Sequence, residues 1–141
     1  MKTNTQVHYN MSRIRGKDTK MEMILRHALY HEGIRYHKNV KALPGTPDIV
    51  LVRYKIAIFC DGDFFHGYDF ARIQANLKKN KDFWISRIRR NQERDLSIDN
   101  ELCQMGYHVL RFWEHEIKKS LPQVLDQIYM EMHLIDTQKG D

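Results

Sequence analysis

Hydrophobic residues mark the first helix of the chain by their spacing. Five apolar residues between positions 21 and 29 recur every three or four residues, as one buried face of an α-helix requires. Thr19 and Glu22 match the S/T-x-x-E capping box that begins many helices, and Gly33 is a residue type that commonly ends one. The pattern predicts a helix over about residues 19–32.

Runs rich in β-branched and aromatic residues come next and predict strands. A short strand is expected at Ile34 to Val40, and "DIVLV" and "KIAIFC" follow the turn signal "PGTP". The three residues "RYK" between the two longer runs indicate a β-hairpin centred on Tyr54. That centre places Asp48 opposite Cys60, so that Asp48 and Asp61 share one end of the sheet.

The second half of the chain alternates long helical patterns with one more strand. An amphipathic stretch over about residues 71–105 ends at Gly106, and "YHVLRFW" predicts a strand after it. Ser120 can cap a last helix with Pro122 in its first turn. The stripe that this helix should bury consists of Val124, Leu125, Ile128, Met132 and Ile135.

The resulting order, α-β-β-β-α-β-α, predicts an α/β or α+β fold in which helices cover a mixed sheet. A chain of 141 residues suits one compact domain and is too short for two independent cores. We expect a basic N-terminal arm at 1–18, a domain at 19–135 and a polar tail at 136–141.

Composition and charge narrow the classes of function. The 23 Lys and Arg residues exceed the 18 Asp and Glu residues, giving a net charge of +5 that suits a nucleic-acid ligand or an ordinary basic protein. The two cysteines lack CxxC spacing, which indicates neither a disulfide framework nor a zinc ribbon. With no signal-peptide pattern and no apolar run of membrane length, the sequence predicts a cytoplasmic protein.

Acidic residues gather at the open end of the predicted hairpin. Asp48 lies before its first strand, Asp61 and Asp63 follow its second, and His66 comes shortly after. Carboxylates only a few ångströms apart repel, and a hard divalent cation such as Mg²⁺ relieves that repulsion. Each acid alone is better explained as a turn residue. Acids at both ends of one hairpin, with a histidine beside them, favour a metal site.

Five stretches carry a resemblance to a known family. These are "MSRIRGKDTKMEMILR", "LPGTPDIVL", "VRYKIAIFCDGDFFHG", "DFWISRIRRNQERD" and "GYHVLRFWEHEI". Their order and spacing resemble the very short patch repair (Vsr) endonucleases, a branch of the PD-(D/E)xK nuclease superfamily, over about residues 10–118. The resemblance implies an α/β, restriction-endonuclease-like core. It also implies Mg²⁺-dependent nicking 5′ to the thymine of T:G mismatches that arise by deamination of 5-methylcytosine.

The resemblance also assigns roles to residues of the hairpin. Asp48 resembles the metal-binding carboxylate, and the backbone carbonyl of Cys60 resembles its partner ligand. Asp61 stands where the family has histidine or aspartate, which makes it a second acid and a candidate ligand. His66 matches the histidine that activates water or assists at the phosphate. Glu22 matches a glutamate that faces the site, although the capping box gives it a competing role.

Further positions resemble DNA-contacting residues of the family. Phe64, Phe65 and Trp84 match aromatic side chains that wedge between bases from the major groove, and Met11 matches a methionine that inserts from the minor groove. For Trp84 a place in a helical core stripe with Phe83 and Ile88 is an equal alternative. Basic residues that could neutralise phosphates are Arg13, Arg15 and Lys17 and the segment 87–94, which could equally be a solvated helix face.

The sequence departs from the wider superfamily in one place and from the repair family in another. The D/E-x-K lysine of the superfamily is absent from Asp61-Gly62-Asp63. The resemblance implies that the repair family also lacks this lysine and uses histidine chemistry, for which His66 is the matching residue. Where the best-known members bind a structural zinc, this chain has Asp63, Tyr68, Phe70 and His115, which include no thiolate. We therefore expect no structural zinc, with Asp63 and His115 paired instead.

The resemblance thus implies a mismatch-directed nickase that acts on double-stranded DNA, and we expect it to act as a monomer in the bacterial cytoplasm. DNA binding would associate it with the nucleoid, and mismatch-repair proteins are candidate partners. Two alternatives stay open at this point: a restriction-like nickase or nuclease that needs no mismatch, and a non-catalytic DNA-binding module with the same fold.

Overall fold

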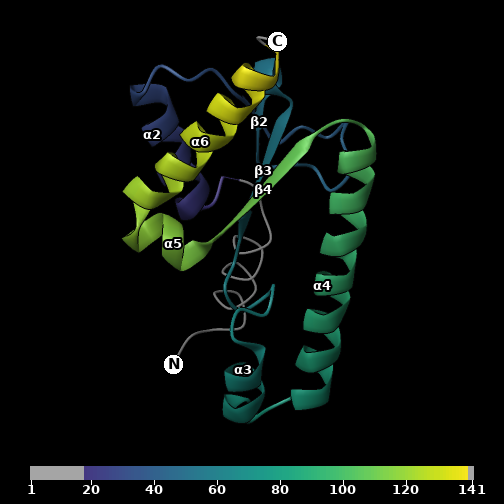
Figure 1. Cartoon of the computed structure of the whole chain (residues 1–141). Helices are drawn as coiled ribbons and strands as arrows, with labels where there is room; N and C mark the ends of the chain where they lie inside the picture. Colours follow the sequence, from purple (N-terminus) through teal and green to yellow (C-terminus); the bar gives the residue numbers. More distant parts are fainter. Residues whose placement is uncertain (1–17, 140–141) are drawn as a thin grey trace.

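A computed structural model describes residues 18–139 of the chain (Figure 1). The elements in chain order are α2 (Lys20–His31), β1 (His37–Lys38), β2 (Ile49–Leu51), the 3-10 helix η1 (Val52–Tyr54), β3 (Ile56–Asp61), α3 (Phe70–Asn76), α4 (Lys81–Gln104), β4 (His108–Trp113), α5 (Glu114–Lys119) and α6 (Leu121–Lys139). The expected order of helices and strands is confirmed, with additional helices between them.

One mixed sheet of four strands lies between two layers of helices. The strand order is β1-β2-β3-β4, with antiparallel pairs at β1/β2 and β2/β3 and a parallel pair at β3/β4. Figure 1 shows α2, α5 and α6 on one face of the sheet and the long α4 on the other. The α/β sandwich predicted from the sequence is therefore confirmed.

Strand β3 is buried at all six positions because helices cover both of its faces. Its even-numbered side chains join the core formed with α2, α5 and α6, and its odd-numbered residues Ala57 and Phe59 pack with Leu102 of α4. Since side chains alternate along a strand, Asp61 continues the row that faces α4. The larger core comprises Leu25, Leu29, Ile49, Leu51, Ile56, Ile58, Cys60, Phe112, Ile117, Val124, Ile128 and Ile135.

The hairpin register differs by one residue from the prediction. The pairs are Ile49 with Ile58, Val50 with Ala57 and Leu51 with Ile56, so Asp48 does not lie opposite Cys60. The connection contains four residues, 52–55, because η1 turns the chain and Lys55 adopts a left-handed conformation with φ of 54°. The predicted three-residue connection centred on Tyr54 was therefore wrong.

The helices also differ from the prediction in three places. The stretch 71–105 is interrupted at residues 77–80, where Asn80 has a left-handed φ of 53° and starts α4. Helix α5 was not predicted, because its six residues are too few to show helical periodicity. Helix α6 continues through Lys139, so residues 136–139 belong to a helix rather than to a frayed end.

Candidate active site

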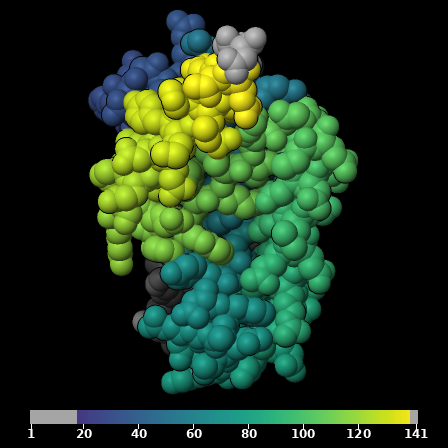
Figure 2. Space-filling view, in the orientation of Figure 1, coloured from purple at the N-terminus to yellow at the C-terminus, as the bar shows by residue number. Residues whose placement is uncertain are grey.

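A cleft of about 860 Å³ opens where the hairpin, α2 and α4 meet. Its walls come from the start of α2, the ends of β2 and β3, the loop after β3, the middle of α4, and Arg111 of β4. In Figure 2 the teal segment after β3 fills the space between α4 and α5 at the lower end of the molecule. The acids and the histidine predicted to form the site, Asp48, Asp61, His66 and Glu22, all line this cleft.

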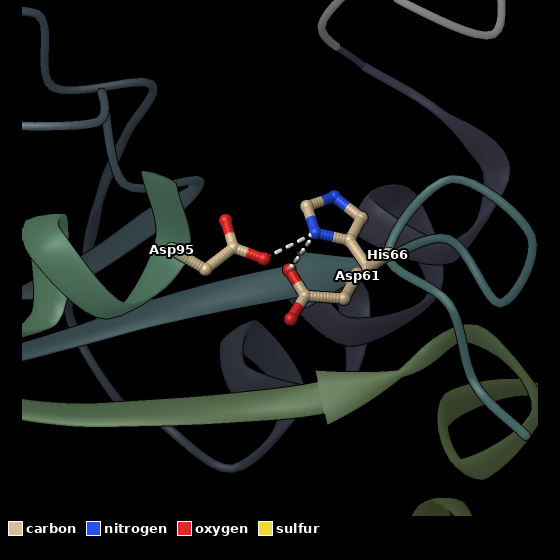
Figure 3. A group of neighbouring side chains, drawn as sticks. All are labelled: Asp61, His66 and Asp95. Atoms are coloured by element: carbon tan, nitrogen blue, oxygen red, sulfur yellow. Dashed lines mark hydrogen bonds and ion pairs between the residues drawn. The ribbon is translucent and has the colours of Figure 1, made fainter. Parts of the chain in front are cut away.

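His66 lies between two carboxylates. Its Nδ1 is 2.6 Å from Oδ2 of Asp95 and 3.8 Å from Oδ1 of Asp61 (Figure 3). The other ring nitrogen, Nε2, points away from both acids in Figure 3. When Nδ1 carries the proton and donates a hydrogen bond to Asp95, Nε2 keeps a free lone pair, as a general base requires.

The loop after β3 is held against α4, which positions the imidazole. Asn91 donates a side-chain hydrogen bond of 2.8 Å to the carbonyl of Phe65, and Gln92 donates one of 3.3 Å to the carbonyl of His66. Gly67 has a φ of +77°, and a Cβ there would clash with Gln92 and lie 2.7 Å from Cγ2 of the fully buried Ile88. A glycine is therefore needed at this position for the loop to approach α4 so closely.

The charges around His66 favour its protonated form. Burial by itself would lower the pKa of His66, but the hydrogen bond to Asp95 and the nearby charges of Asp61 and Asp95 raise it above its ordinary value of 6.5. For Asp61, burial raises the pKa, and the charges of His66 and Arg111 oppose that rise. The surrounding carboxylates therefore hold the proton of the imidazole more tightly than water does, and a base at this position must first lose that proton.

Arg111 supplies the positive charge on this side of the cleft. From β4 it reaches Asp61, with Nη1 at 3.1 and 3.2 Å from the two carboxylate oxygens, and Asp99 of α4 at 2.7 to 3.0 Å. Its guanidinium carbon lies 4.1 Å from the centre of the Phe59 ring. One buried arginine thus holds two acids from different elements.

Asp48 lies apart from these ion pairs. Its Oδ2 accepts a hydrogen bond of 2.7 Å from the backbone N–H of Cys60. Burial, more than any other effect, raises the pKa of Asp48 to about 7; the neighbouring carboxyl groups of Glu22 and Asp61 contribute to the rise, and the Cys60 N–H opposes it. Within residues 18–139 no arginine, lysine or histidine forms an ion pair with Asp48.

Glu22 serves the helix cap and the site together. Its carboxylate accepts hydrogen bonds from the Thr19 hydroxyl at 3.2 Å and from the backbone N–H of Asp18 at 3.0 Å, while Thr19 accepts from the Glu22 N–H. It also pairs with the buried Arg26 at 2.8 Å, and its carboxyl group lies near enough to Asp48 to raise the pKa of that residue. Contacts at the helix start and a place in the cleft therefore coexist, and a catalytic role for Glu22 stays a prediction.

The acidic hairpin thus obtains much of its compensating charge from arginines rather than from metal alone. Arg26 pairs with Glu22, and Arg111 pairs with Asp61. Asp48 is the carboxylate that both arginines leave uncompensated, and it is only half-buried. The backbone carbonyl of Cys60 and the carboxylate of Asp48 are oxygen donors of the kind that Mg²⁺ prefers, so the residues present fit a hard divalent cation.

A second group could also hold a metal ion. One ligand atom each from Asp61, His66 and Asp95 lies within 4.8 Å of the others (Figure 3). This group differs from Asp48 because one of its carboxylates, that of Asp61, already forms an ion pair with Arg111.

The aromatic residues expected to contact DNA form one cluster beside the cleft. Phe64 and Phe65 have ring centres 5.3 Å apart, and the Trp84 ring lies 5.4 Å from Phe64 and 6.1 Å from Phe65. All three are half-buried. Phe83 is 55% exposed, so the alternative core stripe through Phe83, Trp84 and Ile88 was wrong for its first member, although Ile88 is fully buried.

The basic residues divide into two groups. Met11, Arg13, Arg15 and Lys17 lie outside the described residues. In the segment 87–94, Arg87 and Arg94 line the cleft, whereas Arg89 and Arg90 are exposed on α4. Part of this segment is therefore placed where a bound phosphate backbone could reach it.

The positions that match the family's zinc ligands contact one another through other chemistry. Nδ1 of His115 lies 3.0 Å from Oδ1 of Asp63, which confirms the predicted pair. The Tyr68 ring packs 4.3 Å from His115. Phe70 instead lies under Arg89 of α4, 5.8 Å from its guanidinium carbon. These contacts tie the loop after β3 to the start of α5.

Three residues of the site were not predicted from the sequence. Asp95 and Asp99 stand four positions apart, on one face of α4, and Arg111 lies among the apolar residues of the half-buried strand β4. A charged residue within an otherwise apolar strand was the available signal, since such a residue is rarely buried without a partner. The partners themselves depend on the packing of α4 against the sheet, which the sequence pattern does not specify.

A mixed α/β sheet with acids and a histidine at the open end of its hairpin defines a restriction-endonuclease-like nuclease. Comparison with known proteins identifies the family: residues 1–72 match the family described as DNA mismatch endonuclease Vsr. The chain belongs to this family, and it is a DNA endonuclease.

Relatives of known name agree with that assignment. The chain is 43% identical over 106 residues to the type II nicking enzyme V.HpaIIP of Haemophilus parainfluenzae, which covers 75% of each chain. It is 37% identical over 138 residues to the type II nicking enzyme V.NaeI of Lentzea aerocolonigenes, covering 94% of this chain and 82% of the relative. It is 32% identical over 105 residues to the DNA mismatch endonuclease Vsr of Escherichia coli (strain K12), covering 74% and 67%.

None of the helices in residues 18–139 has both the length and the apolar composition needed to cross a membrane.

Proposed function

We propose that this endonuclease is a Mg²⁺-dependent nickase that cuts 5′ to the thymine of T:G mismatches left by deamination of 5-methylcytosine. The single observation that carries the proposal is the pairing of two different groups across one cleft. Asp48 is a carboxylate without a cationic partner among residues 18–139, and His66 is an imidazole with one free nitrogen. Hydrolysis of a phosphodiester requires both a cation site and a proton acceptor.

The metal site of this proposal consists of Asp48 and the backbone carbonyl of Cys60, with Asp61 as the remaining candidate ligand. The N–H of Cys60 fixes the Asp48 carboxylate by a hydrogen bond of 2.7 Å. When bound, Mg²⁺ would polarise the attacking water and stabilise charge on the leaving 3′ oxygen. Glu22 takes part by its contact with Asp48 and by holding the start of α2 at the cleft.

The chemistry of the protein side chains is proton transfer. Nε2 of His66 accepts a proton from water, while Asp95 fixes the ring through Nδ1. The water oxygen forms a bond to phosphorus, and the bond from phosphorus to the 3′ oxygen breaks. The 3′ oxygen takes up a proton and leaves as a hydroxyl, and the phosphate stays on the 5′ carbon of the thymidine.

Mismatch selection is assigned to the aromatic cluster Phe64, Phe65 and Trp84. Inserting aromatic rings between base steps costs unstacking energy, which is smaller at a weakly paired step such as T:G. The cluster adjoins the catalytic loop, since Phe65 directly precedes His66. Met11, Arg13, Arg15 and Lys17 are proposed to contact the same DNA from the N-terminal arm.

The remaining parts of the proposal concern cellular context. One nick requires one active site, so we expect a monomer to act. Its chromosomal substrate places the enzyme in the bacterial cytoplasm, on the nucleoid when bound, with mismatch-repair proteins as candidate partners.

A nickase that needs no mismatch is the second candidate. It is favoured by the names of several relatives, which are type II nicking enzymes. The third idea from the sequence, a non-catalytic DNA-binding module, does not agree with membership of an endonuclease family.

Nicking assays on matched and mismatched duplexes separate the candidates. The purified enzyme is incubated with T:G, T:A and C:G duplexes in several sequence contexts, with and without Mg²⁺. The proposal expects a nick on the thymine strand of the T:G duplex only when Mg²⁺ is present. Equal nicking of matched duplexes would instead establish the second candidate.

A further inference from the structure

Arg111 lies among carboxylates at the cleft, in a place where a metal cation would otherwise be expected to bind. Its guanidinium contacts the carboxylates of Asp61 at 3.1 Å, Asp99 at 2.7 Å and Asp95 at 3.5 Å. Two of these acids, Asp61 and Asp95, belong to the group that could otherwise hold a metal ion with His66. An arginine and a potential metal site therefore share the same ligands.

The contacts fix Arg111 firmly in this place. Its Nε and Nη2 bind Asp99, and its Nη1 lies 3.1 and 3.2 Å from the two oxygens of Asp61, so both carboxylates are contacted by the planar fork. The guanidinium also stacks on the Phe59 ring at 4.1 Å. The side chain is 18% exposed and that of Asp61 only 7%. It therefore has little room to move away from an incoming ion.

A divalent ion bound among Asp61, His66 and Asp95 would meet two obstacles. To bind Nδ1 of His66, the ion would have to replace the 2.6 Å hydrogen bond between Nδ1 and Asp95. If that hydrogen bond is kept, Nδ1 is not available as a metal ligand. It would also lie beside a permanent positive charge of the same sign, since arginine stays protonated in proteins. At Asp48 neither obstacle exists within residues 18–139, because its carboxylate accepts a hydrogen bond from the backbone N–H of Cys60 and forms no ion pair with an arginine.

We propose that Arg111 takes the place of a second metal ion at the Asp61–His66–Asp95 group, so that the enzyme binds one divalent ion, at Asp48. This inference rests on the proposed metal-dependent function and removes Asp61 from its candidate ligands. Asp61 instead acts as a positioning residue that links Arg111 to His66.

Counting bound Mn²⁺ tests the proposal without measuring activity. Mn²⁺ replaces Mg²⁺, and the electron paramagnetic resonance signal of the free ion gives the number bound per chain. The wild-type enzyme should bind one ion, Asp48→Asn should bind none, and Asp61→Asn should still bind one. Two ions on the wild-type enzyme, no ion at all, or loss of an ion in Asp61→Asn would each overturn the proposal.

Substitution of the arginine gives the complementary result. Arg111→Met keeps the apolar contact with Phe59 but removes the charge, and it should bind two ions, the second being lost when Asp61→Asn is added. Arg111→Lys retains a positive charge and should still bind one. One ion on a folded Arg111→Met protein would contradict the proposal, and the wild-type and Asp61→Asn counts decide it if that variant does not fold.

The outcome is separable from the test of the proposed function. A single Mn²⁺ at Asp48 in an enzyme that nicks matched duplexes equally well would leave the role of Arg111 intact while removing mismatch specificity.

Discussion

Replacing Asp48 by asparagine should stabilise the protein and abolish its nicking activity. The carboxylate is held in the folded protein with a pKa raised from 3.8 to about 7, chiefly because burial disfavours its charge. Asparagine has the same shape and no charge, and its Oδ1 can still accept the hydrogen bond from the N–H of Cys60. The side-chain amide can in addition donate to the carboxylate of Glu22.

The magnitude follows from the pKa of Asp48. A group with a raised folded-state pKa binds its proton more tightly in the folded state, so wild-type stability falls as pH rises from about 4 through about 7. Each unit of difference between the folded and unfolded pKa is worth about 1.4 kcal/mol, so the rise from 3.8 to about 7 corresponds to a loss of about 4 kcal/mol in unfolding free energy. Solvent reaches part of Asp48 and screens its charge, so we expect the variant to gain about 2–4 kcal/mol at pH 8 and almost nothing near pH 4.

Urea unfolding at pH values between 4 and 8, without divalent metal, measures this difference. Other titrating groups are present in both proteins and largely cancel in the difference between the two curves. Asp126→Asn removes the same charge from an exposed position of α6 and serves as the matched control. It should change stability by less than about 0.5 kcal/mol at either pH.

The reasoning fails if Asp48→Asn is less stable than the wild-type protein at pH 8, or if the difference does not grow with pH. Nicking near the wild-type rate by the purified variant would show separately that Asp48 is not the metal ligand.

Three further predictions concern the chemistry, the specificity and the zinc positions. His66→Ala should slow single-turnover cleavage about 10²- to 10⁴-fold with little effect on DNA binding; in the wild type at saturating Mg²⁺ the rate should rise with pH through a value above 6.5, because the pKa of His66 is raised and the base must be unprotonated. An unchanged rate in the variant would mean that His66 is structural. Phe64→Ala or Phe65→Ala should reduce the preference for mismatched over matched duplex more than overall affinity, and equal losses in binding assays on both duplexes would show that the rings are general contacts. The purified protein should contain no stoichiometric zinc and should stay folded and active after a zinc-selective chelator, once Mg²⁺ is restored; one zinc per chain by elemental analysis would contradict this.

The local elements of the fold could be predicted because their signals are local. The N-cap at Thr19 and the apolar stripe of α6 depend only on neighbouring residues, and both are present. Of the predicted capping box, Thr19 accepts from the Glu22 N–H, whereas the Glu22 carboxylate accepts from the N–H of Asp18 rather than from that of Thr19. The hairpin register could not be predicted, because it depends on the left-handed conformation of Lys55 and on a turn of 3-10 helix. A difference of one residue in the connection was enough to shift every pair.

The site was predictable only in part for the same reason. Asp48, Asp61 and His66 lie close together in sequence around one hairpin, so their proximity in the fold followed from the hairpin itself. Asp95 and Arg111 reach the site from α4 and β4, and their meeting with the hairpin depends on tertiary packing, because Asp95 lies 29 positions from His66 and Arg111 lies 50 from Asp61. Much of the positive charge at the acidic hairpin, which we had predicted to come from a metal ion, is therefore supplied by Arg26 and Arg111.

The most direct test of the central claim is single-turnover nicking of one duplex with a T:G pair and of the same duplex with T:A at that position, both at saturating enzyme with Mg²⁺. Strands labelled at their 5′ ends locate the cut on a sequencing gel. The account predicts a Mg²⁺-dependent nick immediately 5′ to the mismatched thymine, leaving a 3′ hydroxyl and a 5′ phosphate, at a rate at least about tenfold above that for the T:A duplex, which corresponds to about 1.4 kcal/mol of discrimination. Equal rates on the two duplexes, or cleavage at another position, would contradict it.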